Sequence, residues 1–341
     1  MTAAVAFDRV SIVFGDRPER ALPLMDAGED RAAIQAATGQ VLGVHDCSLE
    51  VAEGEILVLM GLSGSGKSTL LRAVNALNPV VRGEVRVMGR AGVVRVGSCA
   101  PDALRRLRQE TVAMVFQQFG LLPWRTVRDN VGLGLELRGV PRAERDKRVE
   151  EELRLVNLHE RASALVGQLS GGMQQRVGLA RAFATDAPIL LMDEPFSALD
   201  PLIRGRLQDE LLDLQARRNR TIVFVSHDLD EAFKLGDRIA IMEGGRIVQC
   251  GTPRDIFTAP ATPYVADFVA HMNPLGVLRA RDVMEPPLGP APDFNIGPDA
   301  DILAVMARLR TSRALAVREG PELLGHITAE GVLARLVDPR R

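Results

Sequence analysis

Alternating and continuous runs of apolar residues predict strands in the first part of the chain. Residues 5–14 and 44–51 have the pattern of short strands, and residues 83–87 and 92–96 are further candidates. The segment 54–60, GEILVLM, is almost entirely apolar and predicts a strand that is buried in a sheet.

An insert separates the first two predicted strands. Within residues 17–40, the stretch GEDRAAIQAATG predicts a short helix that stops at Gly39. A glycine-rich loop follows the buried strand, and the next stretch, 67–77, predicts a helix that ends before Pro79.

The middle of the chain changes to a helical pattern. It extends from about 118 to 168, with residues 141–156 as the clearest helix. Two apolar strands follow, 188–195 and 221–228, with an amphipathic helix over 201–216 between them. Strands that alternate with helices predict an α/β fold with a parallel sheet.

The ends of three predicted strands carry polar or glycine residues. Gly61, Asp193 and His227 each lie at or just beyond the carboxyl end of a strand. Ligands of such sheets bind beyond the carboxyl ends of the strands, so three separate motifs are expected to meet at one edge.

The C-terminal part has a different composition. Residues 281–299 are rich in loop-forming residues, with four prolines between 285 and 293. A predicted helix over 300–312, a strand around 314–318 and the stretch 323–336 follow, which together suggest a β-α-β-α unit. A unit of about sixty residues is near the lower limit for independent stability, so we expect it to need a partner surface.

Composition narrows the class of protein. The 341 residues suit about two domains, and the net charge of −2 gives no reason to expect nucleic acid as a partner. The three cysteines have no CxxC spacing, which argues against a disulfide framework and a zinc site and fits a reducing cytoplasm. Asp8 and Arg9 are charged residues at a place where a signal peptide would need an unbroken apolar stretch, so we do not expect export. The longest apolar runs are far shorter than the ~20 residues of a membrane span.

The loop GLSGSGKS at 61–68 matches the phosphate-loop pattern G-x-x-x-x-G-K-[ST], between a strand and a helix. Its backbone N–H groups would surround a phosphate, Lys67 would reach the β- and γ-phosphates, and the Ser68 hydroxyl would bind Mg²⁺. A glycine-rich turn with a chance lysine is the alternative, and this context disfavours it. The predicted nucleotide contacts here are Gly61, Leu62, Ser63, Gly64, Ser65, Gly66, Lys67, Ser68 and Thr69.

The strand 188–195, PILLMDEP, ends in two adjacent carboxylates. Asp193 would hold the magnesium shell, and Glu194 would polarise the water that attacks the γ-phosphate. The alternative, a solvated acidic strand end, leaves the match of seven residues unexplained.

A second loop suited to anions begins a later helix. In LSGGMQQR, residues 169–176, a serine and two glycines open the helix. The chain also contains Gln117 in VFQQF, SALD at 197–200 and His227 in VSHD, in that order. Together these motifs resemble the ATP-binding cassette (ABC) family, the ATPase subunits of ABC transporters, over roughly residues 5–250.

The resemblance implies a head-to-tail dimer in which each LSGG helix covers the ATP of the other subunit. Ser170, Gly171, Gly172 and Gln174 would then contact nucleotide in trans, across a two-fold interface. The γ-phosphate would join the two subunits, and its hydrolysis would open the interface. Asp200 would communicate between the two sites.

Three more residues take roles from the resemblance. His227 would contact the γ-phosphate, and Gln117 would join the magnesium site to a contact with the membrane subunit. Phe14 would stack on adenine; a core phenylalanine is the alternative. The other histidines (45, 159, 271 and 326) form no cluster and are interpreted as structural.

The region after Gln117 suggests a docking surface. Leu121, Leu122 and Trp124, the only tryptophan, form an apolar cluster in QFGLLPWRTVRDN. In transporter cassettes this region receives a short helix of the membrane permease. Ordinary core of the helical subdomain is the alternative.

Longer stretches are similar to the quaternary-amine uptake cassettes, importers of glycine betaine, proline and choline. QQFGLLPWRTVRDNVGLGLELRG and ADFVAHMNPLGVL look most like the choline branch, and the resemblance covers about residues 1–278. It implies a homodimer on the cytoplasmic face of the membrane, a separate permease and, indirectly, a substrate-binding protein. The solute rests on resemblance alone.

The tail, with RDVM and LLGHITAEGVLARL, resembles one cystathionine-β-synthase-type (CBS) repeat. We therefore expect an ABC ATPase domain over 1–256, with its helical subdomain at about 118–168, a connecting segment over 257–278, and the repeat over 279–341. Such repeats usually work in pairs. The single repeat would pair across the dimer or be a remnant, and regulation by ionic strength or nucleotide stays open.

The sequence disfavours two other classes of function. A soluble cassette acting on ribosomes or DNA usually has two cassettes per chain or long coiled-coil insertions, and neither is visible here. A regulatory module that only senses ATP would not need the full set of Lys67, Asp193, Glu194 and His227, and a measured turnover separates it from a transporter ATPase. Within transport, the separate-chain organisation and the insert disfavour export.

Overall fold

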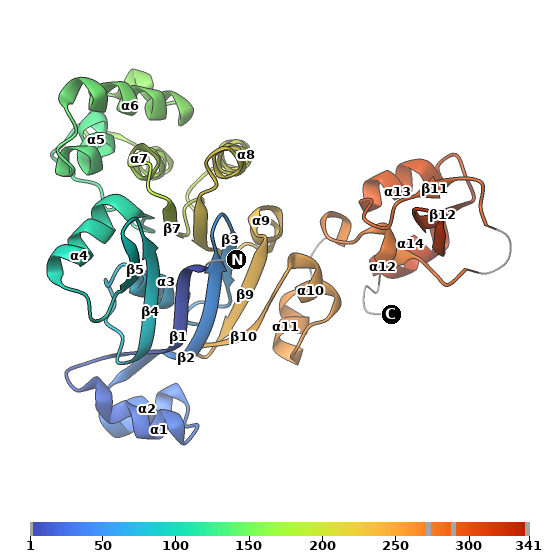
Figure 1. Ribbon diagram of the computed structural model, residues 1–341, viewed down its shortest axis with the longest axis horizontal. Helices are drawn as coiled ribbons and strands as arrows, with labels where there is room; N and C mark the ends of the chain where they lie inside the picture. The colour runs from blue at the N-terminus through green and yellow to red at the C-terminus, as the bar shows by residue number, and fades with distance from the viewer. Residues whose placement is uncertain (1–2, 271–273, 288–290, 338–341) are drawn as a thin grey trace. The chain divides into compact units, whose positions relative to one another are not determined.

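A computed structural model describes residues 3–270, 274–287 and 291–337 (Figure 1). Two compact units can be distinguished. One comprises residues 1–227 with 240–247, and the other comprises residues 228–239 with 248–341. Of the four histidines interpreted as structural, His271 lies outside the described residues.

The first unit contains an antiparallel sheet at its N-terminal end. Its strands are β1 (Ala3–Phe14), β2 (Val41–Ala52), β4 (Arg82–Gly89) and β5 (Gly92–Arg95), in the order β2-β1-β4-β5. Val5 pairs with Val51 on one side and Val87 on the other, and all three are buried. The four strands predicted from the sequence are confirmed.

A second sheet has six strands in the order β10-β9-β3-β8-β7-β6. They are β3 (Ile56–Met60), β6 (Val112–Val115), β7 (Ile189–Asp193), β8 (Thr221–Val225), β9 (Arg238–Glu243) and β10 (Arg246–Gly251). The pairs β3–β8, β7–β8 and β6–β7 are parallel. All residues of β3, β7 and β8 are buried, as expected where both faces of a parallel sheet are covered.

Three strands of this sheet were not predicted. β6 is only four residues long, and so short an apolar run does not distinguish a strand from a helix. β9 and β10 form a pair of neighbours at the edge, and β10 is mostly half-buried. Their apolar residues therefore gave a weak signal.

The larger helices of this unit follow the predicted pattern, except the helix at 101–106, which was not predicted. They are α3 (Lys67–Ala73), α4 (Pro101–Arg106), α5 (Val127–Leu137), α6 (Arg142–Leu155), α7 (Gly171–Ala184) and α8 (Pro201–Arg218). A π-helical turn covers Leu107–Thr111, and 3₁₀ turns cover His159–Arg161 and Val166–Gln168. Figure 1 shows α5, α6 and α7 grouped together. α5 and α6 lie within the region predicted to be helical, about 118–168, and α7 begins after it, at the helix predicted from LSGGMQQR.

The helix expected over 67–77 ends earlier, at Ala73. Ala76 has a left-handed backbone, with φ of +54°. The N–H groups of Leu77 and Asn78 both donate to the carbonyl of Arg72, which satisfies the end of the helix. Pro79 is therefore not what stops it.

The insert is folded. It contains a 3₁₀ turn (Pro18–Ala21), α1 (Leu22–Asp26) and α2 (Arg31–Thr38). The side chain of Asp30 accepts a hydrogen bond from the N–H of Ala33 at the start of α2, and Gly39 ends it with φ of +71°. The predicted helix and its stop at Gly39 are confirmed.

The second unit contains α9 (Leu229–Leu235), α10 (Pro253–Thr258), α11 (Pro263–Phe268), a 3₁₀ turn (Pro274–Gly276), α12 (Ala280–Val283), α13 (Ile302–Leu309) and α14 (Ala329–Val337). Its sheet has the order β11-β12-β13, from Asn295–Ile296, Ala314–Glu319 and Glu322–Thr328.

The expected β-α-β-α order for the tail is corrected to β-α-β-β-α. The stretch 323–336 supplies both strand β13 and helix α14. The chain reverses after β12 at Gly320, where φ is +60°, and β13 pairs antiparallel with β12. The description of this segment as CBS-like stays a prediction.

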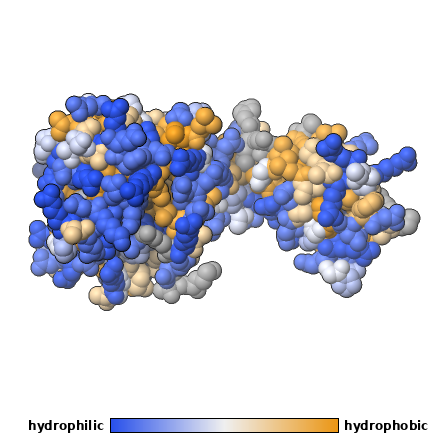
Figure 2. Space-filling model, turned by 90° about the horizontal axis from the view of Figure 1, so that it is seen from above, coloured by the Kyte–Doolittle hydropathy of each residue, from blue (hydrophilic) through white to orange (hydrophobic). Residues whose placement is uncertain are grey.

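Large apolar side chains are exposed at scattered positions of both units, as Figure 2 shows for one face. Trp124 has an exposed fraction of 72%. Within the described part of the chain, no helix is both long enough and apolar enough to cross a membrane.

Candidate nucleotide-binding site

A cavity of about 740 Å³ lies in the first unit, beside the glycine-rich loop. It is lined by the end of β1, one face of α2, the start of β2, the loop and the start of α3, together with three residues that follow strands. The lining residues are Phe14, Arg31, Gln35, Val41, Leu42, Gly43, Ser63, Gly64, Gly66, Lys67, Ser68, Thr69, Gln117, Glu194 and His227.

The loop has the backbone of a phosphate-binding turn. Gly61, Gly64 and Gly66 have φ of +141°, +78° and +103°, a region in which side chains other than hydrogen are strained. A Cβ atom on Gly61 would lie 2.2 Å from the carbonyl oxygen of Met242. The glycines are therefore required by the conformation and by close packing against β9.

Lys67 is buried within this loop. Its Nζ donates to the carbonyls of Gly61 and Leu62, both at 2.8 Å, and to the hydroxyl of Ser65 at 3.4 Å. Burial lowers the pKa of the Lys67 ammonium, and the nearby carboxylate of Glu194 opposes this shift. The ammonium is thus held at the point where the loop surrounds a phosphate.

Asp193 lies at the end of β7 and is fully buried. Its carboxylate accepts a hydrogen bond from the Ser68 hydroxyl at 2.6 Å and forms an ion pair with Arg72 at 2.8 Å. The hydroxyl and carboxylate oxygens are hard donors that Mg²⁺ prefers. No cluster of three or more metal-binding side chains occurs in residues 3–270, 274–287 and 291–337. A magnesium ion at this site would therefore be held by the Ser68 hydroxyl, by groups next to Asp193 and by oxygens of the nucleotide phosphates.

Glu194 follows Asp193 in an unusual backbone conformation, with φ of +50°. Such left-handed backbone costs on the order of 1–3 kcal/mol in a residue that is not glycine, and it is typical of functional sites. The Glu194 Oε2 atom lies 3.2 Å from Nε2 of Gln117 and 3.5 Å from Nδ1 of His227. Glu194 and His227, predicted to act at the γ-phosphate, therefore meet in one cavity with Gln117, predicted at the magnesium site.

Phe14 lines the cavity with an exposed fraction of 39%, so it is not a core residue. A Cβ atom on Gly43 would lie 2.9 Å from Cε2 of the Phe14 ring. The glycine thus allows the ring to lie against β2 at the wall of the cavity, where adenine stacking remains a prediction.

The second glycine-rich loop does not line this cavity. Ser170 caps α7 by accepting from the N–H of Met173 at 3.4 Å, and Gly171 and Gly172 open the helix. The amide of Gln174 donates to the carbonyls of Val166 and Leu169 in the preceding turn. This separation is what contact in trans requires, and the contact itself stays a prediction.

Gln175 joins α7 to the loop that carries Glu194. The sequence did not predict this role for Gln175. Its side chain is buried; it donates to the carbonyl of Glu194 and accepts from the N–H of Ala198, both at 3.1 Å. Asp200 follows as the cap of α8, accepting from the N–H of Ile203. The helix expected to cover the partner's ATP is thus bonded to the loop that carries this subunit's own Glu194.

Replacement of Gln175 by Ala is expected to lower the turnover of ATP about tenfold with little change in KM for ATP, because Glu194 loses the bond that orients its peptide. The two unpaired backbone groups also lower the free energy of unfolding, by about 1–3 kcal/mol each. Turnover should be measured well below the melting temperature. Gln249→Ala is the matched control, because the Gln249 amide likewise donates to one backbone carbonyl, that of Ala259, and accepts from one backbone N–H, that of Ala261, outside the cavity lining. Equal turnover of the two variants would contradict the role of Gln175.

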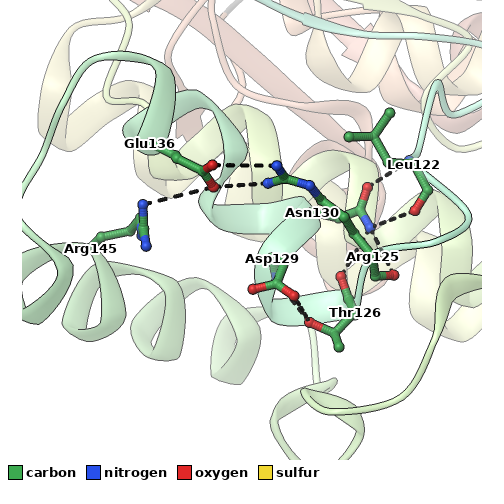
Figure 3. A network of polar contacts seen from close by, with 7 residues as sticks. All are labelled: Leu122, Arg125, Thr126, Asp129, Asn130, Glu136 and Arg145. Atoms are coloured by element: carbon green, nitrogen blue, oxygen red, sulfur yellow. Dashed lines mark hydrogen bonds and ion pairs between the residues drawn. The ribbon is translucent and has the colours of Figure 1, made fainter.

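The loop that carries Trp124 is fixed by a polar network at the start of α5 (Figure 3). The amide of the buried Asn130 donates to the carbonyls of Leu122, Arg125 and Thr126 and accepts from the N–H of Leu122. Arg125 pairs with both oxygens of Glu136, and this hydrogen bonding lowers the pKa of the Glu136 carboxyl.

The network leaves the predicted docking cluster accessible. Leu121 and Leu122 are half-buried and Trp124 is exposed, so the cluster is not closed core. A fixed backbone under an exposed aromatic side chain suits a binding surface.

Four polar side chains near the site were not found from the sequence: Arg31, Gln35, Arg72 and Gln175. Each lies in a predicted helix, where a polar side chain usually faces solvent. Only the packing of these helices on the loop and on β7 brings them to the nucleotide site.

Comparison with known proteins agrees with this geometry. Residues 44–197 match the family described as "ABC transporter". The glycine betaine/proline betaine transport system ATP-binding protein ProV of Salmonella typhimurium is 50% identical over 271 residues, which are 80% of this chain and 67% of that protein. The glycine betaine transport ATP-binding protein OpuAA of Bacillus subtilis is 44% identical over 325 residues, 95% of this chain and 76% of that protein.

A solved structure has the same core fold. The dimeric structure of MJ0796, described as a bacterial ABC transporter cassette, is matched with a TM-score of 0.63 and 30% identity, covering 73% of this chain and 99% of that chain. A second structure of MJ0796, in a post-hydrolysis state bound to ADP and Pi, is matched with a TM-score of 0.62 and 31% identity.

Proposed function

Because this chain belongs to the ABC transporter family, as an ATP-binding subunit of the glycine betaine and proline betaine import branch, we propose that it hydrolyses ATP to drive uptake of choline or a related quaternary amine. The observation that carries the ATPase part is the meeting of Lys67, Glu194, Gln117 and His227 in one cavity beside the phosphate loop.

The proposed chemistry uses residues already in contact. Lys67 and the loop N–H groups would hold the β- and γ-phosphates, and Glu194 would accept a proton from the attacking water. His227 and Gln117, both close to Oε2 of Glu194, would orient that carboxylate and contact the γ-phosphate. Mg²⁺, when bound near Ser68 and Asp193, would neutralise charge that develops on the phosphates.

The proposed active form is a homodimer. Ser170, Gly171 and Gly172 lie away from the cavity of their own subunit and open a helix, so they are free to bind the γ-phosphate of a second copy. The MJ0796 cassette is a dimer in its solved structure. ATP would then hold the two copies together from both sides, and hydrolysis would release them.

The proposed partners are a membrane permease and, through it, a substrate-binding protein. The exposed Trp124, with Leu121 and Leu122, would receive the permease on the cytoplasmic face of the membrane. ProV and OpuAA are named for glycine betaine transport, whereas the segments after Gln117 and before residue 278 look most like the choline branch. The proposed cargo is therefore choline, with glycine betaine as the alternative.

The cargo is tested by ATP hydrolysis in the assembled transporter. The chain, its neighbouring permease and its binding protein are reconstituted and titrated with choline, glycine betaine and proline. Stimulation by choline alone is expected. Stimulation mainly by glycine betaine or proline would move the cargo to the alternative. No response to any of the three would contradict the proposed cargo and leave an ABC ATPase with its cargo unassigned.

The same assembly tests the docking surface. Trp124→Ala should lose the solute stimulation while the isolated chain keeps its basal turnover. Val93→Ala, which shortens an exposed apolar side chain on β5, is the matched control and should be stimulated like the unchanged chain.

A further inference from the structure

The insert contributes a wall to the nucleotide cavity. Arg31 and Gln35 lie one turn apart on α2, and both line the cavity beside the phosphate loop. Ile34, on the adjacent face of the helix, is fully buried. One face of α2 thus packs into the unit while the adjacent face meets the ATP site.

The Arg31 guanidinium joins two parts of that site. One terminal nitrogen donates to the carbonyl of Gly64 in the phosphate loop, and the other donates to the carbonyl of Gly43 on β2 at 2.7 Å. A Cβ atom on Gly245 would lie 2.8 Å from the guanidinium, so this glycine makes room for it. The planar fork of arginine serves two acceptors at once, which the ammonium of lysine does less well.

The insert is anchored well enough to hold this arginine in position. Val13, Ala21, Met25, Ile34 and Leu42 form a buried apolar cluster that joins the insert to β1 and β2. Arg82 on β4 pairs with both carboxylate oxygens of Asp26 at the end of α1. Movement of α2 would break contacts with the antiparallel sheet, so Arg31 is held by packed structure.

The charge of the cavity also depends on Arg31. Among the residues that line it, the permanently cationic ones are Lys67 and Arg31, and Glu194 is anionic. The Nε atom of Arg31 is buried without a hydrogen-bond partner among the described residues. Burial lowers the pKa of the guanidinium, which nevertheless stays charged at neutral pH. A polyphosphate in this cavity would meet two cations, Lys67 and Arg31.

We propose that Arg31 is a positioning residue for nucleotide binding: it fixes the Gly64 peptide of the phosphate loop against β2 and adds positive charge beside the bound polyphosphate. The insert is then a working part of the ATP site. In a trans peptide the C=O and N–H point in opposite directions, so a bond to the Gly64 carbonyl also sets the direction of the Ser65 N–H. This role of Arg31 in nucleotide affinity does not depend on which solute the transporter carries.

The test is equilibrium binding of ATP, ADP and AMP to the purified full chain, with ATP turnover measured in parallel. Arg31→Ala is expected to raise the Kd for ATP and ADP about tenfold, the size of one charge-assisted hydrogen bond. The Kd for AMP should change less than threefold, because AMP lacks the phosphates that the loop surrounds. KM for ATP should rise with Kd, while kcat at saturating ATP stays within about twofold.

Two further variants separate the role of Arg31 from a general loss of structure. Arg20→Ala removes the same charge from an exposed position of the insert and should bind all three nucleotides normally. Arg31→Lys keeps the charge but not the two-carbonyl bridge, and it should recover less than half of the lost affinity. Normal ATP binding by Arg31→Ala, an equal loss for AMP, or full recovery by Arg31→Lys would each overturn the proposal.

Discussion

Replacement of Glu194 by Gln is expected to lower the rate of ATP hydrolysis about 10²- to 10⁴-fold while ATP still binds. Gln has the shape of Glu but cannot accept a proton from the attacking water. The carboxylate lies between Gln117 and His227, and its left-handed backbone directs it into the cavity beside the phosphate loop. Phosphate release and the Kd for ATP are the two measurements.

The binding measurement separates loss of chemistry from loss of the site. If Glu194→Gln bound ATP as tightly as the unchanged chain and formed a stable ATP-dependent dimer, the missing step would be hydrolysis alone. Glu243→Gln makes the same change at an exposed carboxylate at the end of β9 and should retain turnover. Near-normal phosphate release by Glu194→Gln would falsify the assignment of Glu194 as the base.

Replacement of Lys67 by Ala is expected to raise the Kd for ATP about 10- to 100-fold and to lower hydrolysis about 10²- to 10³-fold. The ammonium is the cation held inside the loop, 2.8 Å from the carbonyls of Gly61 and Leu62. A phosphate would replace these carbonyl contacts with a stronger, charge-assisted bond. Calorimetric titration with ATP and a phosphate-release assay measure the two effects.

An exposed lysine supplies the control for this change. Lys147 on α6 is exposed, so Lys147→Ala removes one positive charge at a position outside the cavity lining and should leave both values unchanged. Lys67 also donates to two backbone carbonyls of the loop, so its loss can lower stability. The melting temperature of the Lys67→Ala variant should therefore be recorded. ATP affinity within twofold of the unchanged chain would contradict the predicted contact.

The relation between α7 and Glu194 suggests how the two sites of a dimer affect each other. The helix proposed to cover the partner's nucleotide is bonded through Gln175 to the peptide of Glu194 and to Ala198. Movement of α7 when it meets the partner's γ-phosphate would therefore change the position of this subunit's own proposed base. The variants of Gln175 and Glu194 test two ends of this connection.

Much of the chemistry could be predicted from sequence because the motifs are local. The phosphate loop needs glycines at fixed spacing, since only glycine adopts the φ values of Gly61, Gly64 and Gly66 without strain. Asp193 follows a continuous buried strand, and His227 follows another. Parallel strands have their carboxyl ends at one edge, so pattern and topology together predicted a shared site.

Boundaries and weak strands could not be predicted in the same way. The strands β6, β9 and β10 depend on pairing with neighbours that are distant in sequence, and their own apolar patterns are short. The tail has one strand more than predicted, because the chain turns at Gly320 and β13 pairs with β12. A hairpin of this kind is stabilised by cross-strand contacts, which periodicity does not report.

By itself, the sequence determined which residues could bind a phosphate and a magnesium ion, because these depend on residue type and spacing within a few positions. The tertiary structure alone decided that Arg31, Arg72 and Gln175 belong with them. On an isolated helix each of these polar side chains would face water. Packing of the insert against β1 and β2, of α3 beside β7 and of α7 beside β6 turns them instead toward acceptors in the site. These acceptors are backbone carbonyls for Arg31 and Gln175 and the Asp193 carboxylate for Arg72.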